Sequence, residues 1–166
     1  GAGVWCYPLT IMDHASRFLL ACQGMRNTNF KETQQTFERV FREYGLPERI
    51  RTDNGIPFAS TGRAGLSQLS IWWLRLGIIP ERIEPGRPDQ NGRHERMHRT
   101  LKSTLPQPAA IAWEAQQKHF DRFMQHYNHE RGHEALGQKT PASCYLPSPR
   151  AYPEKLPEMG YASHVE

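Results

Sequence analysis

Residues 49–55 of this chain read Arg-Ile-Arg-Thr-Asp-Asn-Gly, and they carry the clearest signal for the fold. Its first four residues predict a short strand, and Asp53 then stands where that strand ends. Asn54 and Gly55 form a common turn signal and are expected to shape the loop beside the acid. In α/β proteins, ligands bind where the strands of the sheet end. The stretch therefore predicts an α/β fold and a functional role for Asp53.

A second acid, Glu95, follows 42 positions after Asp53. It belongs to PGRPDQNGRHERMHR, residues 85–99, and lies near the start of a helix predicted over 91–105. Two carboxylates from different elements offer the hard oxygen ligands that Mg²⁺ or Mn²⁺ prefers. Such metal sites activate the attacking oxygen and stabilise the leaving oxygen of a phosphodiester. Asp53 and Glu95 are therefore predicted to bind Mg²⁺ or Mn²⁺ and to catalyse the cutting and joining of nucleic acid.

The charge around Glu95 indicates nucleic acid as the partner. The formal net charge of the chain is +4, and residues 86–102 alone hold five basic residues and two acids. Along the predicted helix, Glu95 shares one face with basic residues at spacings of three, four and seven. The residues predicted to contact DNA phosphates are Arg87, Arg93, His98, Arg99 and Lys102. The alternative is a solvated helix face on which Glu95 forms a salt bridge with Arg99.

The same segment contains a competing motif. His94-Glu95-Arg96-Met97-His98 is an H-E-x-x-H sequence, the pattern of zinc metallopeptidases. Its two histidines lie one helical turn apart and can share a zinc ion, with Glu95 as the general base. The neighbouring arginines disfavour this interpretation because they would crowd a Zn²⁺ site with positive charge, and it also leaves Asp53 without a role. A zinc metallopeptidase nevertheless stays open as an alternative function.

The rest of the sequence predicts alternating strands and helices. The predicted elements are a strand hairpin (5–12 and 18–22), helices over 30–44, 65–76, 91–105 and 111–129, and strands over 49–52 and 78–83. This order indicates a mixed sheet flanked by helices. Residues 1–131 are expected to form this core, and residues 132–166 are expected to form a proline-rich extended tail without a periodic apolar face.

The cysteines and the hydropathy pattern indicate the compartment. Cys6, Cys22 and Cys144 are widely spaced and form neither a zinc pattern nor a disulfide framework, so we expect reduced thiols in a cytoplasmic protein. No segment approaches the ~18 consecutive apolar residues needed to span a bilayer, so no membrane is expected as a partner. The first residues also lack the basic start and apolar run of a signal peptide.

Taken together, these stretches resemble the integrase-like catalytic core of bacterial insertion-sequence transposases, relatives of the retroviral integrases. The resemblance runs from Cys6 to Arg150, and its most specific strings are YGLPERIRTDNGIPFAS and EPGRPDQNGRHERMHRTLK. It implies an RNase H-like fold and a D-D-E metal triad, in which Asp53 matches the second acid and Glu95 the third. It further implies DNA 3′-end cleavage at the element ends and strand transfer into target DNA, catalysed by a homo-oligomer assembled on that DNA.

The sequence departs from this family at its start. The resemblance places the first acid on a strand ahead of the hairpin, central in the sheet, and Gly1 stands about where that strand should have ended. The first catalytic aspartate and the central strand are therefore expected to be missing, which would leave the hairpin and the 49–52 strand without a shared partner. Asp13 is a further metal candidate, although it matches the family's turn pattern D-x-x-S-R, in which its ordinary role is to cap the turn ahead of Ser16. A catalytically inactive fragment that still binds DNA is thus a second alternative.

Overall fold

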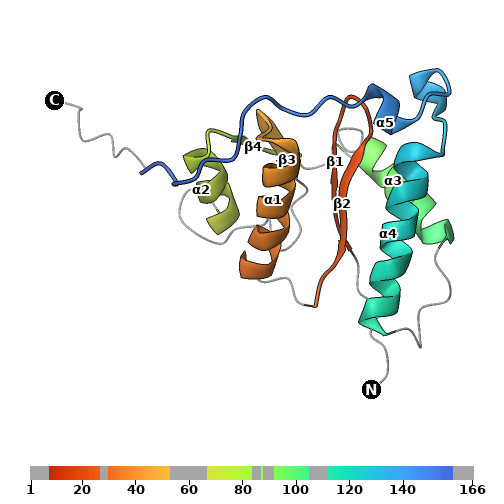
Figure 1. The fold of residues 1–166 in the computed structure, drawn as a ribbon, viewed down its shortest axis with the longest axis horizontal. Coiled ribbons are helices and arrows are strands. Elements are labelled where there is room, and N and C mark those ends of the chain that lie inside the picture. The colour runs from red at the N-terminus through yellow and green to blue at the C-terminus, as the bar shows by residue number, and fades with distance from the viewer. Residues whose placement is uncertain are drawn as a thin grey trace.

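The computed structural model describes residues 8–26, 30–52, 67–83, 87, 92–104 and 112–158 (Figure 1). The elements are β1 (Pro8–Met12), β2 (Leu19–Gly24), α1 (Phe30–Tyr44), β3 (Arg49–Thr52), α2 (Gln68–Arg75), β4 (Ile79–Arg82), α3 (Gly92–Thr104), α4 (Trp113–His129), a 3₁₀ turn (Glu134–Leu136) and α5 (Pro141–Cys144). The helix predicted over 30–44 and the strand predicted over 49–52 have those bounds. In the described part of the chain, no helix combines the length and the apolar character needed to cross a membrane.

The strands of the described residues form two separate two-stranded sheets. β1 and β2 pair as an antiparallel hairpin, with Pro8 opposite Gly24, whereas β3 and β4 pair in parallel. Both orientations of a mixed sheet are therefore present, but the hairpin and β3 have no hydrogen-bonded neighbour in common. Pro8 opens β1, where the missing N–H of proline costs the ladder least.

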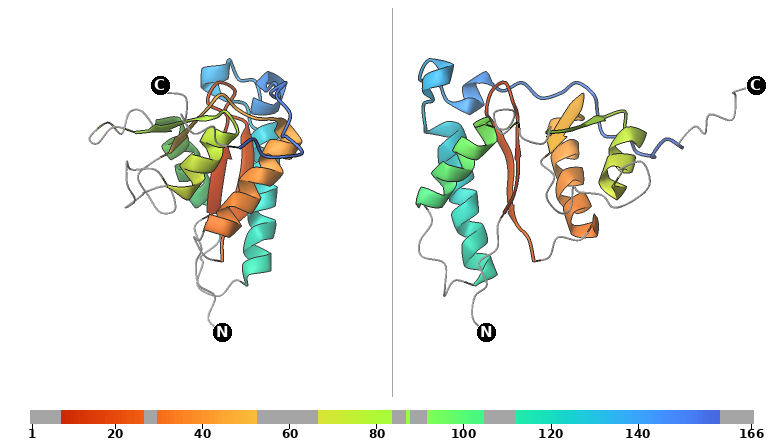
Figure 2. Two further views of the ribbon diagram at one scale, coloured as in Figure 1. Left: turned by 90° about the vertical axis from the view of Figure 1, so that its left-hand side faces the viewer. Right: turned by 180° about the vertical axis from the view of Figure 1, so that it is seen from behind.

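The hairpin is the middle layer of the molecule. α1 and α2 lie on one side of it, and α3 and α4 lie on the other (Figures 1 and 2). The first side is held by a buried apolar cluster that includes Ala21 of β2 and Trp73 of α2. The second side is held by a separate cluster that includes Met97 of α3 and Phe120 of α4. The hairpin therefore presents a different residue set to each pair of helices, as a strand with side chains on alternate faces does.

Residues 145–158 form an extended strap that returns from α5 towards α2 (Figure 1, blue). Its Tyr152 and Leu156 pack against the cluster between α1 and α2. The carbonyl of Arg150 accepts a hydrogen bond from the N–H of Leu46, just after α1 (2.7 Å). This part of the tail predicted over 132–166 is therefore extended, yet it contributes to the packing of the core.

Candidate metal and nucleic-acid site

The strand that leads to the first predicted acid has the predicted position. β3 ends at Thr52, whose carbonyl accepts a hydrogen bond from the N–H of Ile83, the residue after β4 (3.2 Å). Asp53, Asn54 and Gly55 lie outside the described residues. The metal-binding role of Asp53 and the loop-shaping role of its two neighbours therefore stay predictions.

Glu95 lies in the first turn of α3, and its side chain is exposed to solvent. The helix turns Met97 and Leu101 into the core, and this leaves the carboxylate on the outer surface. The positive end of the helix dipole favours a carboxylate in this position. Within the part of the chain that the structure describes, neither Glu95 nor Arg99 has an ion-pair partner, so the salt bridge considered as an alternative is not formed. Glu95 is thus an exposed hard oxygen donor, which fits a divalent cation such as Mg²⁺.

The two histidines beside Glu95 meet at one hydroxyl group. Thr10 of β1 has its Oγ1 2.7 Å from Nε2 of His94 and 2.7 Å from Nε2 of His98. The two imidazole rings are stacked, with centroids 4.7 Å apart and planes at 29°. This cluster ties α3 to the hairpin beside the residue predicted to bind metal. Sequence reasoning missed Thr10, because the available signal was only a polar residue alternating with apolar ones along a strand.

The described residues supply no third ligand for a zinc ion at His94 and His98. Among them, no group of three or more His, Cys, Asp or Glu side chains is placed to hold a metal ion. Zinc sites in proteins use at least three such ligands. The Nε2 atoms of His94 and His98 instead converge on the Thr10 hydroxyl.

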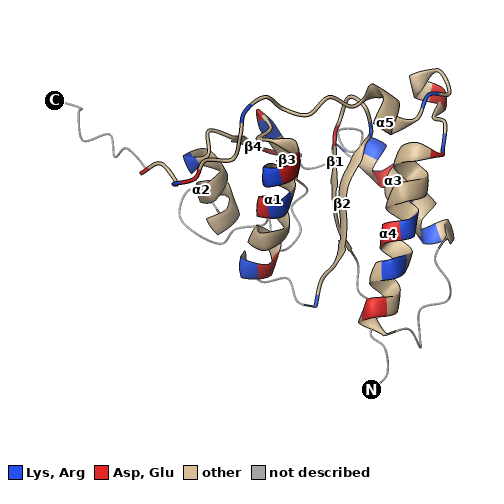
Figure 3. Cartoon of the chain, in the orientation of Figure 1, with Lys and Arg blue, Asp and Glu red and all other residues tan. Residues whose placement is uncertain are grey.

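Three of the residues predicted to contact DNA are exposed. They are Arg87, Arg99 and Lys102. Lysine and arginine positions are distributed over α1, α3 and α4 (Figure 3). Only α3 combines them with the predicted metal ligand Glu95, so a phosphate chain near that carboxylate would meet positive charge on the same helix.

The other two predicted DNA contacts, Arg93 and His98, bind atoms of the hairpin. His98 is half-buried against Thr10 rather than directed to solvent. The guanidinium of Arg93 donates a hydrogen bond to the backbone carbonyl of His14, in the hairpin turn. Both contacts join α3 to the hairpin, so the start of this helix is fixed at the turn as well as at Thr10.

Asp13 caps the hairpin turn. Its Oδ2 accepts hydrogen bonds from the backbone N–H of Ser16 (2.9 Å) and from the Ser16 hydroxyl (2.5 Å). Arg17 follows with a φ of 63°, in the left-handed region that this tight turn requires. The capping role is therefore observed for Asp13, and its role as a metal ligand stays a prediction.

Positive charge gathers around this turn. Partial burial lowers the pKa of His14, and the nearby Arg93 and Arg51 lower it further. Partial burial likewise lowers the pKa of Arg17, with Arg93 as the next cause. Arg51 belongs to β3 and Arg93 to α3, so the strand that precedes Asp53 and the helix that carries Glu95 each place an arginine near this turn. Arginines from different elements therefore make the surface around this turn positively charged, which favours the binding of a polyanion.

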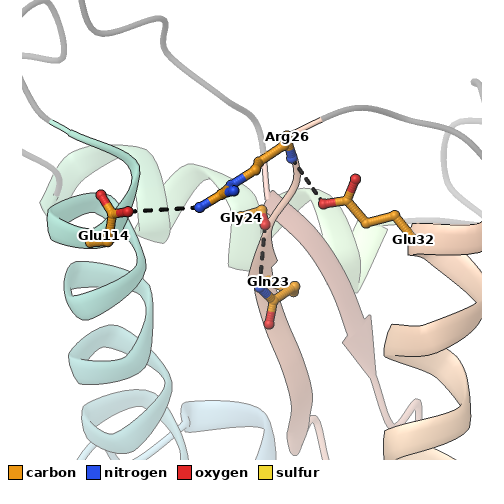
Figure 4. A network of polar contacts seen from close by, with 5 residues as sticks. All are labelled: Gln23, Gly24, Arg26, Glu32 and Glu114. Atoms are coloured by element: carbon orange, nitrogen blue, oxygen red, sulfur yellow. Dashed lines mark hydrogen bonds and ion pairs between the residues drawn. The ribbon is translucent and has the colours of Figure 1, made fainter.

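A separate cavity of about 500 Å³ lies between the start of α1 and the start of α4. Arg26 occupies its edge: its backbone N–H donates to Glu32 (3.0 Å), and its guanidinium lies 3.7 Å from Glu114 (Figure 4). The same guanidinium lies over the ring of Trp113, 4.7 Å from the centroid. These contacts connect the end of β2 to α1 and α4, and no residue predicted for the site lines the cavity. We therefore assign this network a structural role.

Comparison with known proteins gives two matches to one family description. A family model described as "Integrase core domain" matches residues 1–88, and a second with the same description matches residues 76–141. The chain is 33% identical over 99 residues to the Gag-Pol polyprotein of Baboon endogenous virus (strain M7), which covers 60% of the chain and 5% of the polyprotein. The Pol polyprotein of Feline endogenous virus ECE1 is also 33% identical over 99 residues, with 60% of the chain and 9% of the polyprotein covered. The chain thus spans a small part of the length of these relatives.

A solved structure with the same fold is the catalytic core domain of the BIV integrase. The two agree with a TM-score of 0.60 at 18% identity, over 82% of each chain. A chain of the simian T-cell lymphotropic virus intasome, solved in complex with PP2A regulatory subunit B56 gamma, agrees with a TM-score of 0.63 at 21% identity. That match covers 90% of this chain and 50% of the other. These likenesses confirm the predicted fold class, an RNase H-like arrangement of small sheets flanked by helices.

Proposed function

This chain belongs to the integrase core domain family, and on that premise we propose that it is the catalytic core of a DDE transposase of the bacterial insertion-sequence type. The family depends on divalent metal in general. In the proposal, Asp53 and Glu95 hold Mg²⁺ or Mn²⁺, with Asp13 as a further candidate ligand. The cation supplies activation of an attacking water or 3′-hydroxyl and stabilisation of the leaving oxygen.

The observation that carries this proposal is the state of Glu95, an exposed carboxylate with no ion-pair partner among the described residues, on a helix rich in arginine. A carboxylate alone would repel the phosphates of DNA. Arg99 and Lys102, exposed on the same helix, offset this repulsion and bind the backbone on either side of the reacting phosphodiester. The proposed substrates are element ends and target DNA, bound by a homo-oligomer of the chain.

The reaction proposed is 3′-end cleavage followed by strand transfer, and strand transfer with pre-cut ends and Mn²⁺ tests it most directly. We expect Asp53→Asn and Glu95→Gln each to lower strand transfer by about 100-fold or more, because each removes a ligand of the cation. Glu134→Gln, which neutralises an exposed carboxylate of the 3₁₀ turn, is the matched control and should keep the activity. Full activity in Glu95→Gln would contradict the assignment of the third acid.

A second candidate function is DNA binding without turnover. The observation that favours it is the exposure of Arg99 and Lys102 on α3, because these side chains can bind the DNA backbone whether or not the metal site is complete. The same chain would then bind DNA with an affinity that falls steeply with salt, yet show no strand transfer with any divalent cation. Fluorescence anisotropy with labelled DNA, measured beside the strand-transfer assay, separates the two functions.

A further inference from the structure

We propose that Thr10 is a positioning residue for α3: its hydroxyl donates a hydrogen bond to one imidazole of the His94–His98 pair and accepts one from the other, and this double contact sets the direction of Glu95. The inference deepens the proposed function and rests on it, since it concerns the helix that carries the predicted metal ligand. It also gives both histidines of the H-E-x-x-H sequence a role that is neither zinc binding nor DNA contact.

The side-chain pattern of β1 places the hydroxyl opposite α3. Leu9 and Ile11 pack on the cluster between the hairpin and α1, whereas Met12 packs on the cluster between the hairpin, α3 and α4. Thr10 shares the face of Met12, because side chains two positions apart lie on one side of a strand. Its Oγ1 thereby reaches both Nε2 atoms at 2.7 Å, across sequence separations of 84 and 88 residues.

The numbers of donors and acceptors on the hydroxyl and on the two imidazoles limit how the three groups can be hydrogen-bonded. A threonine hydroxyl has one proton to donate and can accept up to two hydrogen bonds, whereas a neutral imidazole has one N–H and one acceptor nitrogen. If both rings donated to Oγ1, the hydroxyl proton would go to neither of them, so the proposed arrangement has one ring accept the hydroxyl proton and the other donate its Nε2–H to Oγ1. In that arrangement the two rings are opposite tautomers, with the proton on Nδ1 in one and on Nε2 in the other.

The contact matters for Glu95 because it acts together with the hydrogen bond from Arg93 to the His14 carbonyl in fixing the rotation of α3. His94, Met97, His98 and Leu101 follow one another at the spacing of a single helix face. Met97 and Leu101 are the only buried residues of this helix, so its apolar stripe is narrow. Successive residues of an α-helix differ by about 100° around the axis, so the setting of His94 also sets that of Glu95. Two directional hydrogen bonds one turn apart restrict the rotation of α3 about its axis more than a narrow apolar stripe does, because apolar contacts are not directional.

Substitution of the hydroxyl in the 166-residue chain tests the proposal. Thr10→Val removes the hydroxyl at nearly constant volume, and Thr10→Ser retains it. Thr100→Val is the matched control, because within the described residues the Thr100 hydroxyl donates to the Arg96 carbonyl of its own helix (3.0 Å). One readout is the ¹⁵N NMR signature of the two imidazoles, which reports their tautomers. The other is the Mn²⁺ concentration at half-saturation, followed by water-proton relaxation.

We expect opposite tautomers in the wild type and in Thr10→Ser, and a mixture in both rings in Thr10→Val. We also expect Thr10→Val to raise the Mn²⁺ midpoint at least threefold, with Thr100→Val unchanged, whereas a purely structural role would change the unfolding temperature alone. Unaltered imidazole signals in Thr10→Val, or an unaltered Mn²⁺ midpoint, would overturn the positioning role. A wild type whose Mn²⁺ binding equals that of Glu95→Gln would instead contradict the proposed function, so the two failures are distinguishable.

Discussion

Cys22 and Tyr145 illustrate at the scale of single residues how burial changes chemistry. Burial raises the pKa of the Cys22 thiol to about 12, with the Asp121 carboxylate as the second cause. Burial also raises the pKa of the Tyr145 phenol to about 12, with Asp13 as the next cause. Tyr145 is stacked on Phe18 of the hairpin, with ring centroids 4.6 Å apart. Both groups therefore hold their protons more tightly in the folded chain than in the unfolded chain.

The free energy of unfolding should consequently fall at alkaline pH. In the unfolded chain the thiol ionises near pH 9.0 and the phenol near pH 10.0, whereas in the folded protein both do so only at about pH 12. Between these values the unfolded state binds fewer protons, so stability decreases as pH rises, by up to about 1.4 kcal/mol per pH unit for the buried Cys22 thiol and by less for the Tyr145 phenol, whose charge solvent partly screens. Urea midpoints measured from pH 8 to 11.5 should show this decline.

Tyr145→Phe isolates the contribution of the phenol to this decline. The substitution keeps the stacked ring on Phe18 and removes the titrating group. The variant should match the wild type at pH 8 and lose less stability above pH 10. Parallel curves for the two proteins over the whole range would show that the phenol ionises equally in both states.

At the scale of elements, α4 does more than cover the hairpin with apolar side chains. The Asn128 side chain accepts a hydrogen bond from the N–H of Leu19 (2.7 Å) and donates one to the carbonyl of Leu19 (2.8 Å). Towards the other end of β2, the Gln117 side chain accepts from the N–H of Gly24 (2.7 Å) and donates to the carbonyl of Cys22 (3.1 Å). Two side-chain amides thus take the place of a neighbouring strand along this edge, which protects it from pairing with another chain.

Asn128→Ala should therefore destabilise the protein by about 2–4 kcal/mol, because it leaves a buried N–H and a buried carbonyl of Leu19 without partners. Gln125→Ala, an exposed position of the same helix, is the control and should stay within about 0.5 kcal/mol of the wild type. Urea denaturation gives both values. Faster amide hydrogen exchange at Leu19 in Asn128→Ala would assign the loss to this edge, and equal stability of the two variants would contradict it.

The elements differ in how far sequence could predict them. α1 has the predicted bounds because Phe37, Val40 and Phe41 repeat at helical spacing on a face that is buried. The contact of Thr10 with α3 could not be predicted, because it pairs a strand with residues more than 80 positions away and no periodic pattern marks it. The exposure of Glu95 was predictable, because the apolar residues of its own helix lie on a different face. The inward position of His98 was not, because it depends on the hydrogen bond with Thr10 of β1.

At the scale of the whole molecule, the strap of residues 145–158 joins the two sides of the hairpin. Its Tyr145 stacks on Phe18 at the hairpin, and its Tyr152 and Leu156 pack between α1 and α2. Gly45, just after α1, makes room for the strap: a Cβ added there would lie 2.5 Å from the carbonyl oxygen of Ser148. The sequence lacks a periodic signal for this segment because backbone carbonyls and isolated aromatic rings make its contacts.

Arg150 is the side chain that binds the strap to the α1–α2 side. Its guanidinium donates hydrogen bonds to the carbonyl of Pro47 (2.6 Å), after α1, and to the carbonyl of Gly77 (3.3 Å), after α2. No strand pairing joins this side to the hairpin in the described residues. The strap is therefore a main connection between the two halves, and its release should loosen the α1–α2 side without unfolding the hairpin.

Arg150→Met keeps the aliphatic stem and removes the donors, so it should lower the free energy of unfolding by about 1–2 kcal/mol. It should also speed cleavage after Lys155 by a lysine-specific protease, with cleavage after Lys139 as the internal reference outside the strap. Arg150→Lys should rescue only in part, because one ammonium group does not reproduce the planar fork that reaches two carbonyls. Arg122→Met, at an exposed position of α4, controls for the loss of charge. If Arg150→Met matched Arg122→Met in both stability and cleavage after Lys155, the two halves would have to be held together by the hairpin packing alone.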